Sequence, residues 1–254
     1  MSVKRRDGRS VLDGLRQAGC LKARFPRPED AAWMNIVTLN TSGGIAGGDA
    51  LESAFTVGEG GRATIAAQAA ERFYRALPGS AASQVRTRIA VANGGAAEWL
   101  PQETILFDRC AVQRRLEVEL AADAWFLGVE SLVFGRAAMG EVVAQAALRD
   151  VIQVRRDGRL LLHDAIRLEG DVAATLHRPA IAQGARAIAT VIHVAPDAEA
   201  MIGALRDLAV ASSAWDGMLV ARLLAADSAT LRGDVIRVLN VLRGGRALPR
   251  VWQC

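Results

Sequence analysis

The chain has 254 residues, of which 51% are hydrophobic and 23% are charged, as in soluble globular proteins. Its 31 basic and 27 acidic residues leave a net charge of only +4, and the arginines are spread along the chain, so we expect no nucleic-acid partner. Every apolar stretch ends before the roughly 20 residues that span a bilayer, and the basic N-terminus lacks the apolar core of a secretory signal, so we expect a cytoplasmic protein without a membrane partner.

Apolar and polar residues alternate from Trp33 to about residue 195, which predicts β-strands. The segment 84–92, QVRTRIAVA, is the first clear case. The sequence Asn-Gly-Gly at 93–95 predicts a turn, and segment 96–108 is then expected to return as the partner of the first strand. Pro101 indicates an edge or a bulge in that returning strand.

Three later segments show the same pattern. RRLEVEL, residues 114–120, alternates apolar and charged residues, and ARAIATVIHV, residues 185–194, predicts another strand. Between them, the dipeptide Asp157-Gly158 lies between two apolar runs, which is a strong signal for a β-hairpin.

Beyond residue 196 the apolar residues no longer alternate with polar ones, and two segments show the spacing of helices instead. Segment 196–212 predicts a helix with Asp197 as its N-cap, and MLVARLLA, residues 218–225, predicts a short strand. Segment 227–245 has Asp227 or Ser228 as a candidate N-cap and Gly244 just past the end of its apolar pattern, so it predicts a second helix.

These elements together predict a mainly β (α+β) fold. We expect a single domain over residues 1–254, with a large, mostly antiparallel β body and about two helices packed on it near the C-terminus.

A glycine-rich loop, GGIAGGD at 43–49, resembles a phosphate-binding loop at first sight. However, an acid, Asp49, stands where such loops carry a lysine, and the spacing of the glycines does not fit a dinucleotide site. We therefore expect a structural loop, in which glycines permit a tight path and Asp49 accepts hydrogen bonds from the loop itself.

Motifs for catalysis are missing from the sequence. It has no G-x-S-x-G, no H-E-x-x-H and no phosphate-binding lysine motif. The three cysteines and three histidines are widely spaced, which fits reduced thiols and argues against a local metal site. We expect no catalytic residue and no tightly bound cofactor.

Acids beside apolar or aromatic residues are the remaining candidates for a site. They are Glu71, Glu98, Glu103, Asp108, Glu130 and Glu141. One interpretation is that they are paired or solvated groups on strands. The other is that they line a site or a passage, with Arg72, Arg75, Arg109 and Arg136 as partners.

Six blocks of the sequence resemble, in the same order, the signature blocks of the urease accessory protein UreD family, called UreH in some organisms. They run from residue 39 to the C-terminus: LNTSGGIAGGD, QAAERFYR, EWLPQETILFDR, ESLVFGRAAMGE, DGMLVARLL and LPRVWQ.

This resemblance implies a mainly β, non-catalytic scaffold for urease maturation. Such proteins bind the urease apoprotein and UreF, recruit the GTPase UreG through UreF, and assist the insertion of nickel. The resemblance makes the C-terminal helices a candidate contact for UreF. It also gives the acids a purpose, because carboxylates bind nickel weakly enough to release it, so only transient nickel is expected. The candidate passage or partner residues are Asp49, Glu71, Arg72, Glu98, Glu103, Asp108, Glu130, Arg136 and Glu141.

An alternative from another class is a hydrolase on a β scaffold. It would use two carboxylates flanking a groove, either Glu98 with Glu103 or Glu130 with Glu141. This alternative requires such a pair at the base of an open cleft.

Overall fold

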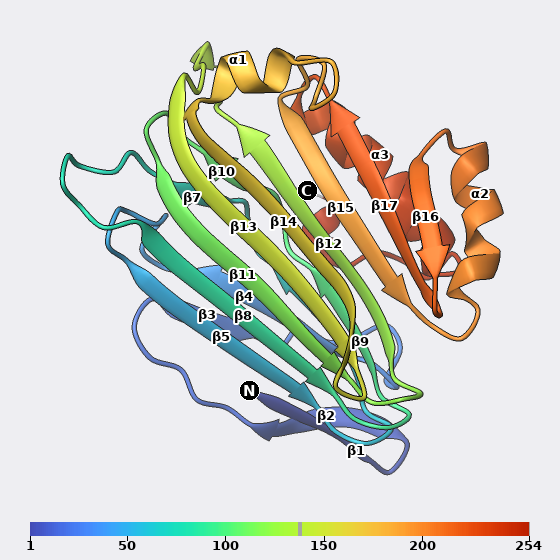
Figure 1. The fold of residues 1–254 in the computed structure, drawn as a ribbon. Coiled ribbons are helices and arrows are strands. Elements are labelled where there is room, and N and C mark those ends of the chain that lie inside the picture. The colour runs from blue at the N-terminus through green and yellow to red at the C-terminus, as the bar shows by residue number, and fades with distance from the viewer. Residues whose placement is uncertain (137–138, 254) are drawn as a thin grey trace.

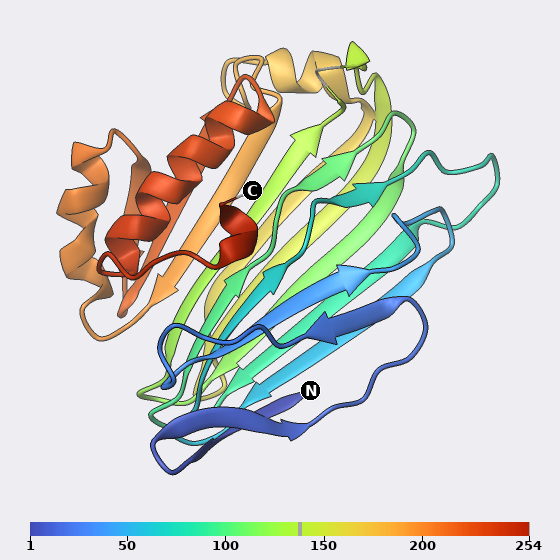
Figure 2. The same cartoon turned by 180° about the vertical axis from the view of Figure 1, so that it is seen from behind.

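The computed structural model describes residues 1–136 and 139–253. Two large β-sheets lie face to face, and helices cover part of the outer side of one of them (Figures 1 and 2). The first sheet, called sheet A, has seven strands in the order β14 (Arg159–Asp171), β13 (Gln145–Arg156), β11 (Ala111–Leu120), β8 (Ser83–Val91), β5 (Ala50–Val57), β1 (Ser2–Arg6) and β2 (Arg9–Gly14).

The second sheet, called sheet B, has ten strands. Eight follow the order β16 (Ala211–Trp215), β17 (Met218–Ala225), β15 (Ala187–Val194), β12 (Trp125–Phe134), β9 (Ala96–Leu100), β6 (Arg62–Ala67), β4 (Met34–Asn40) and β3 (Leu21–Arg24). The short strand β10 (Thr104–Leu106) pairs with β12, and β7 (Glu71–Phe73) pairs with β10.

The mainly β prediction is confirmed, but the prediction of a mostly antiparallel body is wrong, because the sheets are mixed. In sheet A the four strands β5, β8, β11 and β13 run parallel to one another, and so do β4, β6, β9 and β12 in sheet B. From β4 to β13 the long strands alternate between the two sheets. Strands that are neighbours in one sheet are therefore two steps apart along the chain, and they run in the same direction.

The turn at Asn93-Gly94-Gly95 illustrates this arrangement. It does not return the chain as the antiparallel partner of β8; it carries the chain from β8 in sheet A to β9 in sheet B. Pro101 follows the end of β9, which lies between β6 and β12, so the expectation of an edge strand there is also wrong. The hairpin at Asp157-Gly158 is confirmed: β13 and β14 pair antiparallel, and both turn residues have positive φ, 49° and 73°.

The predicted alternation places apolar side chains between the sheets. Ile89 and Val91 of β8 and Leu116 and Val118 of β11 are buried, and they pack in one core with residues of sheet B such as Phe126. A second core lies on the other face of sheet B, under α3.

Three α-helices are described: α1 (Val172–His177), α2 (Ile202–Asp207) and α3 (Ser228–Leu242), and two short 3₁₀ helices cover Ala198–Met201 and Arg250–Trp252. In α3 the Asp227 carboxylate accepts a hydrogen bond from the Thr230 backbone N–H at 2.8 Å, and Gly244 follows the helix with φ 60°, as predicted.

The earlier helix differs from the prediction. Asp197 makes no capping hydrogen bond, the segment starts as a 3₁₀ helix, and the chain already forms β16 from Ala211. The sequence did not predict α1, because six residues are too short for a helical period to show. Among the described residues, none of the helices is long and apolar enough to span a membrane.

Candidate functional site

The glycine-rich loop is held by its own contacts. Gly43 and Gly48 have φ of 80° and 88°, and a Cβ on Gly44 would meet the Tyr74 ring at 2.3 Å. The Asp49 carboxylate accepts a hydrogen bond from the Ala46 backbone N–H at 2.8 Å, as the sequence predicted. These contacts account for the loop's glycines and for the position of Asp49 without a bound anion.

Glu98 is the most buried of the candidate acids. It has no exposed surface and lies on the outer face of sheet B, under the C-terminal segment. Arg243 donates to both of its oxygens at 2.9 and 3.1 Å, Arg246 donates at 2.6 Å, and the Thr64 hydroxyl donates at 2.6 Å. Burial alone would raise the pKa of Glu98, but the hydrogen bonds and charges of these partners outweigh it and lower the pKa. Glu98 is therefore an ionised carboxylate with two arginines.

Glu130 lies on the opposite face, between the two sheets. The Arg114 guanidinium from β11 is 2.7 Å from one of its oxygens, and the Trp99 indole N–H donates to the other at 2.7 Å. Arg114 also donates to both oxygens of Asp150, at 2.9 and 2.6 Å, and to the Thr104 hydroxyl. One arginine thus serves two buried carboxylates.

The charges of this network determine the direction in which the pKa of Glu130 is shifted. Burial raises its pKa, the Arg114 charge opposes the rise, and the Asp150 charge adds to it. The net effect is a raised pKa, so Glu130 holds a proton more readily than Glu98 does.

Glu141, Arg136 and Asp108 form a third group. The Arg136 side chain donates to Glu141 at 2.8 Å and lies over the Phe107 ring at 4.3 Å. Glu141 accepts from the backbone N–H of Asp108 at 3.3 Å, while the Asp108 carboxylate accepts from the backbone N–H of Gln145 at 2.9 Å. Burial would raise the pKa of Glu141, but Arg136 and the two backbone donors lower it. These acids hold neighbouring loops together.

Glu71 and Glu103 are neighbours through their backbones, because the Glu71 N–H donates to the Glu103 carbonyl at 3.0 Å. The side chain of Glu71 is half-buried and accepts two long hydrogen bonds, 3.3 Å each, from the Asn40 amide. Burial raises the pKa of Glu71, and within residues 1–136 and 139–253 no ion pair to its carboxylate is found. The backbone N–H of Arg72 donates to the Glu71 carboxylate at 3.1 Å, and this hydrogen bond, the Asn40 amide and the charge of the exposed Arg72 side chain offset only part of the effect of burial.

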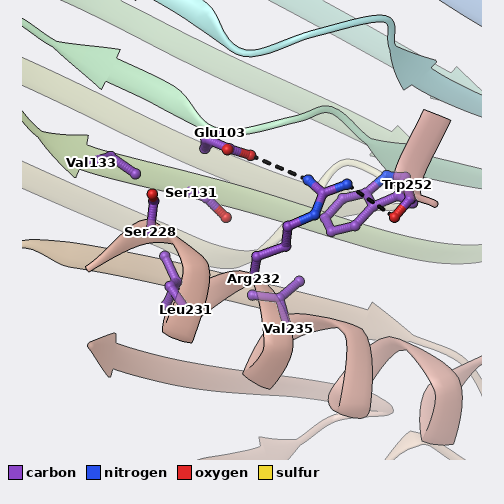
Figure 3. A pocket seen from close by; sticks show the side chains of 8 residues that line it. All are labelled: Glu103, Ser131, Val133, Ser228, Leu231, Arg232, Val235 and Trp252. Atoms are coloured by element: carbon purple, nitrogen blue, oxygen red, sulfur yellow. Dashed lines mark hydrogen bonds and ion pairs between the residues drawn. The ribbon is translucent and has the colours of Figure 1, made fainter. Parts of the chain in front are cut away.

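Glu103 faces α3. Its carboxylate is 24% exposed and lies 3.5 Å from the guanidinium of Arg232. Figure 3 shows Arg232 reaching from α3 between Glu103 and Trp252, beside a cavity of about 10 Å³. A cavity of that size has room for about one water molecule.

The structure thus separates the predicted residues into distinct groups. It brings together Asp108, Arg136 and Glu141, and it brings Glu71 next to Arg72 and Glu103. Glu98 and Glu130 lie on opposite faces of sheet B and are enclosed by arginines. Neither pair of carboxylates that the hydrolase alternative needs lies at the base of an open cleft, because one member of each pair is buried.

Sequence reasoning missed the basic partners. They are Arg114, Arg232, Arg243 and Arg246, together with the acid Asp150. The sequence pattern could have indicated two of these five residues. Arg114 lies on the inward face of its strand with Val112 and Leu116, and Asp150 lies on the inward face of its strand with Leu148. A charged residue at an inward position of a strand needs a buried partner.

The cysteines and histidines do not form a site in the described part of the chain. Burial raises the pKa of Cys110 to about 12, so its thiol is inert, and burial lowers the pKa of His193, whose ring contacts the Phe126 carbonyl. No cluster of three or more His, Cys, Asp or Glu side chains that could hold a metal ion occurs among residues 1–136 and 139–253.

Comparison with known proteins assigns the family. The family model described as UreD urease accessory protein matches residues 1–253. A urease accessory protein UreD from Dinoroseobacter shibae is 48% identical over 98% of this chain and 89% of its own length. Those from Rhizobium leguminosarum bv. trifolii and Methylobacterium sp. (strain 4-46) are each 44% identical, over 99% and 97% of this chain and 93% and 90% of their own lengths. The chain therefore belongs to the UreD family of urease accessory proteins.

Proposed function

We propose that this chain is a non-catalytic scaffold in urease maturation, which binds the urease apoprotein and UreF, engages UreG through UreF, and assists nickel insertion in the cytoplasm. The observation that carries this proposal is the match to the UreD family over residues 1–253. Nickel is cargo in this proposal, and no tightly bound cofactor is required.

The contacts of the acids support a scaffold. Glu98 and Glu130 are bound by arginines inside the fold, and Glu141 holds the loop of Asp108. A catalytic carboxylate must reach a substrate, whereas these three side chains are occupied by protein donors. Their geometry fits a structural role.

Glu71 is the best candidate for contact with nickel in transit. Its carboxylate is half-buried and lacks an ion pair within the described residues, so its negative charge is the least compensated of the six acids. A divalent cation would relieve this desolvated charge, and one carboxylate with an amide neighbour is too weak a ligand set to retain nickel. Glu103, next to Glu71 along the backbone, is the second candidate.

The packing of α3 limits which of its residues are available for the proposed contact with UreF. Leu231, Val235 and Val238 of this helix are buried against sheet B, so they are not available to a partner. A contact in this region falls instead to the exposed side of α3, which carries Arg237 and Asn240.

A co-purification experiment tests the proposal. The tagged chain is expressed with the urease apoprotein, UreF and UreG, and the bound proteins and the nickel content of urease are measured. We expect all three partners to co-purify and urease to gain nickel only when the chain is present. Arg237→Glu should weaken capture of UreF, whereas Arg167→Glu, an exposed change on β14, should not. Full nickel loading of urease without the chain would contradict the maturation role.

A further inference from the structure

A cavity of about 340 Å³ lies between the N-terminal segment 26–37 and the C-terminal segment 243–251. We call it the strap pocket, because residues 246–251 cross the outer side of sheet B as a strap (Figure 2). The strap is fastened beyond the pocket, where the Trp252 indole N–H donates to the Leu100 carbonyl at 3.0 Å. Sites for small molecules have volumes of about 300–1,000 Å³, so the strap pocket is large enough for a small ligand.

The walls of the strap pocket are largely apolar. Trp33 and Ile36 line it on the side of the N-terminal segment, Ala66 contributes from β6, and Leu248 and Val251 contribute from the strap. Walls of this kind favour the apolar body of a ligand by removing its surface from water.

The charged group at the floor of the strap pocket has a net charge of one positive unit. Glu98 supplies one negative charge, and Arg243 and Arg246, which both bind it, supply two positive charges. The lining also includes two arginines, Arg27 and Arg250, and two acids, Glu29 and Asp30, whose formal charges sum to zero. An anion with a single charge would therefore neutralise the pocket.

Arg246 is placed to bind such an anion. One nitrogen of its guanidinium donates to Glu98, and the group lies over the Trp33 ring at 3.9 Å from the ring centre. Its side chain is 28% exposed, and its remaining N–H groups form no other hydrogen bond within the described residues. By contrast, Arg243 is 3% exposed and donates also to the carbonyls of Arg246 and Ala247.

We propose that the strap pocket binds a small monocarboxylate with an apolar body. The carboxylate accepts hydrogen bonds from Arg246, and the body lies between Trp33 and Leu248. A ligand in this position contacts both chain segments that form the pocket, so its binding stabilises the strap against opening. The proposal does not depend on urease, UreF or nickel.

The test uses the purified full-length chain and three probes. Phenylacetate has both the charge and the body, phenylacetamide lacks the charge, and acetate lacks the body. Binding is followed by NMR of the indole N–H signals, with the Trp33 signal assigned by its loss in Trp33→Phe. We expect phenylacetate to shift the signal of Trp33 and not that of Trp215 on β16, and to bind at least about tenfold more tightly than either of the other probes.

Two variants locate the charge. Arg246→Met keeps the aliphatic stem and leaves Glu98 paired with Arg243, and it should weaken phenylacetate binding by at least about tenfold. Arg167→Met, which removes an exposed arginine from β14, should not change it. Equal binding of phenylacetate and phenylacetamide, a Trp33 signal that does not move, or unchanged binding by Arg246→Met would each overturn the proposal. The comparison of probes on the unchanged chain needs no variant to fold, and its failure would leave the role in urease maturation untouched.

Discussion

Glu98→Gln is the substitution for which the structure gives the sharpest expectation. The change keeps the shape of the side chain but removes the negative charge that faces Arg243 and Arg246. A glutamine also presents an N–H donor where the carboxylate now accepts from donors on both sides. Arg243 is 3% exposed and cannot reach water without movement of the strap, so its charge stays buried without a counter-charge.

The size of the effect follows from this burial. Removing one partner of a buried ion pair costs about 3–5 kcal/mol of folding free energy. For a chain of this length 1 kcal/mol corresponds to about 2–4 °C, so the Tm should fall by roughly 10 °C. Differential scanning calorimetry or urea unfolding of the purified variant measures this loss.

A matched control separates burial from charge. Glu169→Gln removes a carboxylate that also pairs with an arginine, Arg167, but both side chains are exposed, at 67% and 77%. This change should leave the Tm equal to that of the parent chain within experimental error. A loss of less than about 1 kcal/mol in Glu98→Gln, or equal losses in both variants, would refute the reasoning from buried charge.

The stability that Glu98 contributes should also depend on pH. Its pKa in the folded chain is lowered from its ordinary value of 4.5, so its contribution is present above that value and is lost as the pH falls through the lower folded pKa. The difference in free energy of unfolding between the parent chain and Glu98→Gln should therefore be constant from pH 6 to pH 8 and narrow in acid.

Three further substitutions distinguish the other acids. Glu130→Gln should destabilise the chain less than Glu98→Gln, as urea unfolding would show, because Asp150 still neutralises Arg114 and the raised pKa of Glu130 means that its charge is already disfavoured. Glu71→Gln should leave the Tm unchanged or slightly higher while lowering the nickel content of co-expressed urease; full nickel loading would remove Glu71 from the delivery role. Glu103→Gln should change stability by less than about 1 kcal/mol, because its pair with Arg232 is long and partly exposed, and unchanged nickel loading would likewise exclude Glu103 from delivery.

Much of the fold could be predicted from local pattern. Alternation gave the inward residues of β8 and β11, and the Asp157-Gly158 turn and the Asp227 cap were recognised from their local chemistry. The pairing of strands could not be predicted in the same way. A period of two tells which side chains share a face, but it does not tell which strand lies alongside, so an alternation of the chain between two sheets looks the same as a series of hairpins.

The candidate site was predictable to a smaller extent. The acids stood out because of their apolar neighbours, but their partners are far away in the sequence. Arg243 is 145 residues from Glu98, and Arg232 follows Glu103 by more than half the chain. A local pattern shows that a buried charge needs compensation; it does not show whether the compensation is an arginine, a shared proton or a metal ion.

The amount of compensation differs among three of the acids, and so does the energetic cost of removing their charge. Glu98 has two arginines, Glu130 shares one arginine with Asp150, and Glu71 has the Asn40 amide and the Arg72 backbone N–H, with no ion pair in the described residues. Removal of charge is therefore costly at Glu98, cheaper at Glu130, and neutral or favourable at Glu71. It follows that Glu71 is the position where loss of the proposed nickel delivery can be separated from loss of stability, because the substitution that would remove the proposed nickel ligand also relieves the fold of a half-buried charge without an ion pair in the described residues.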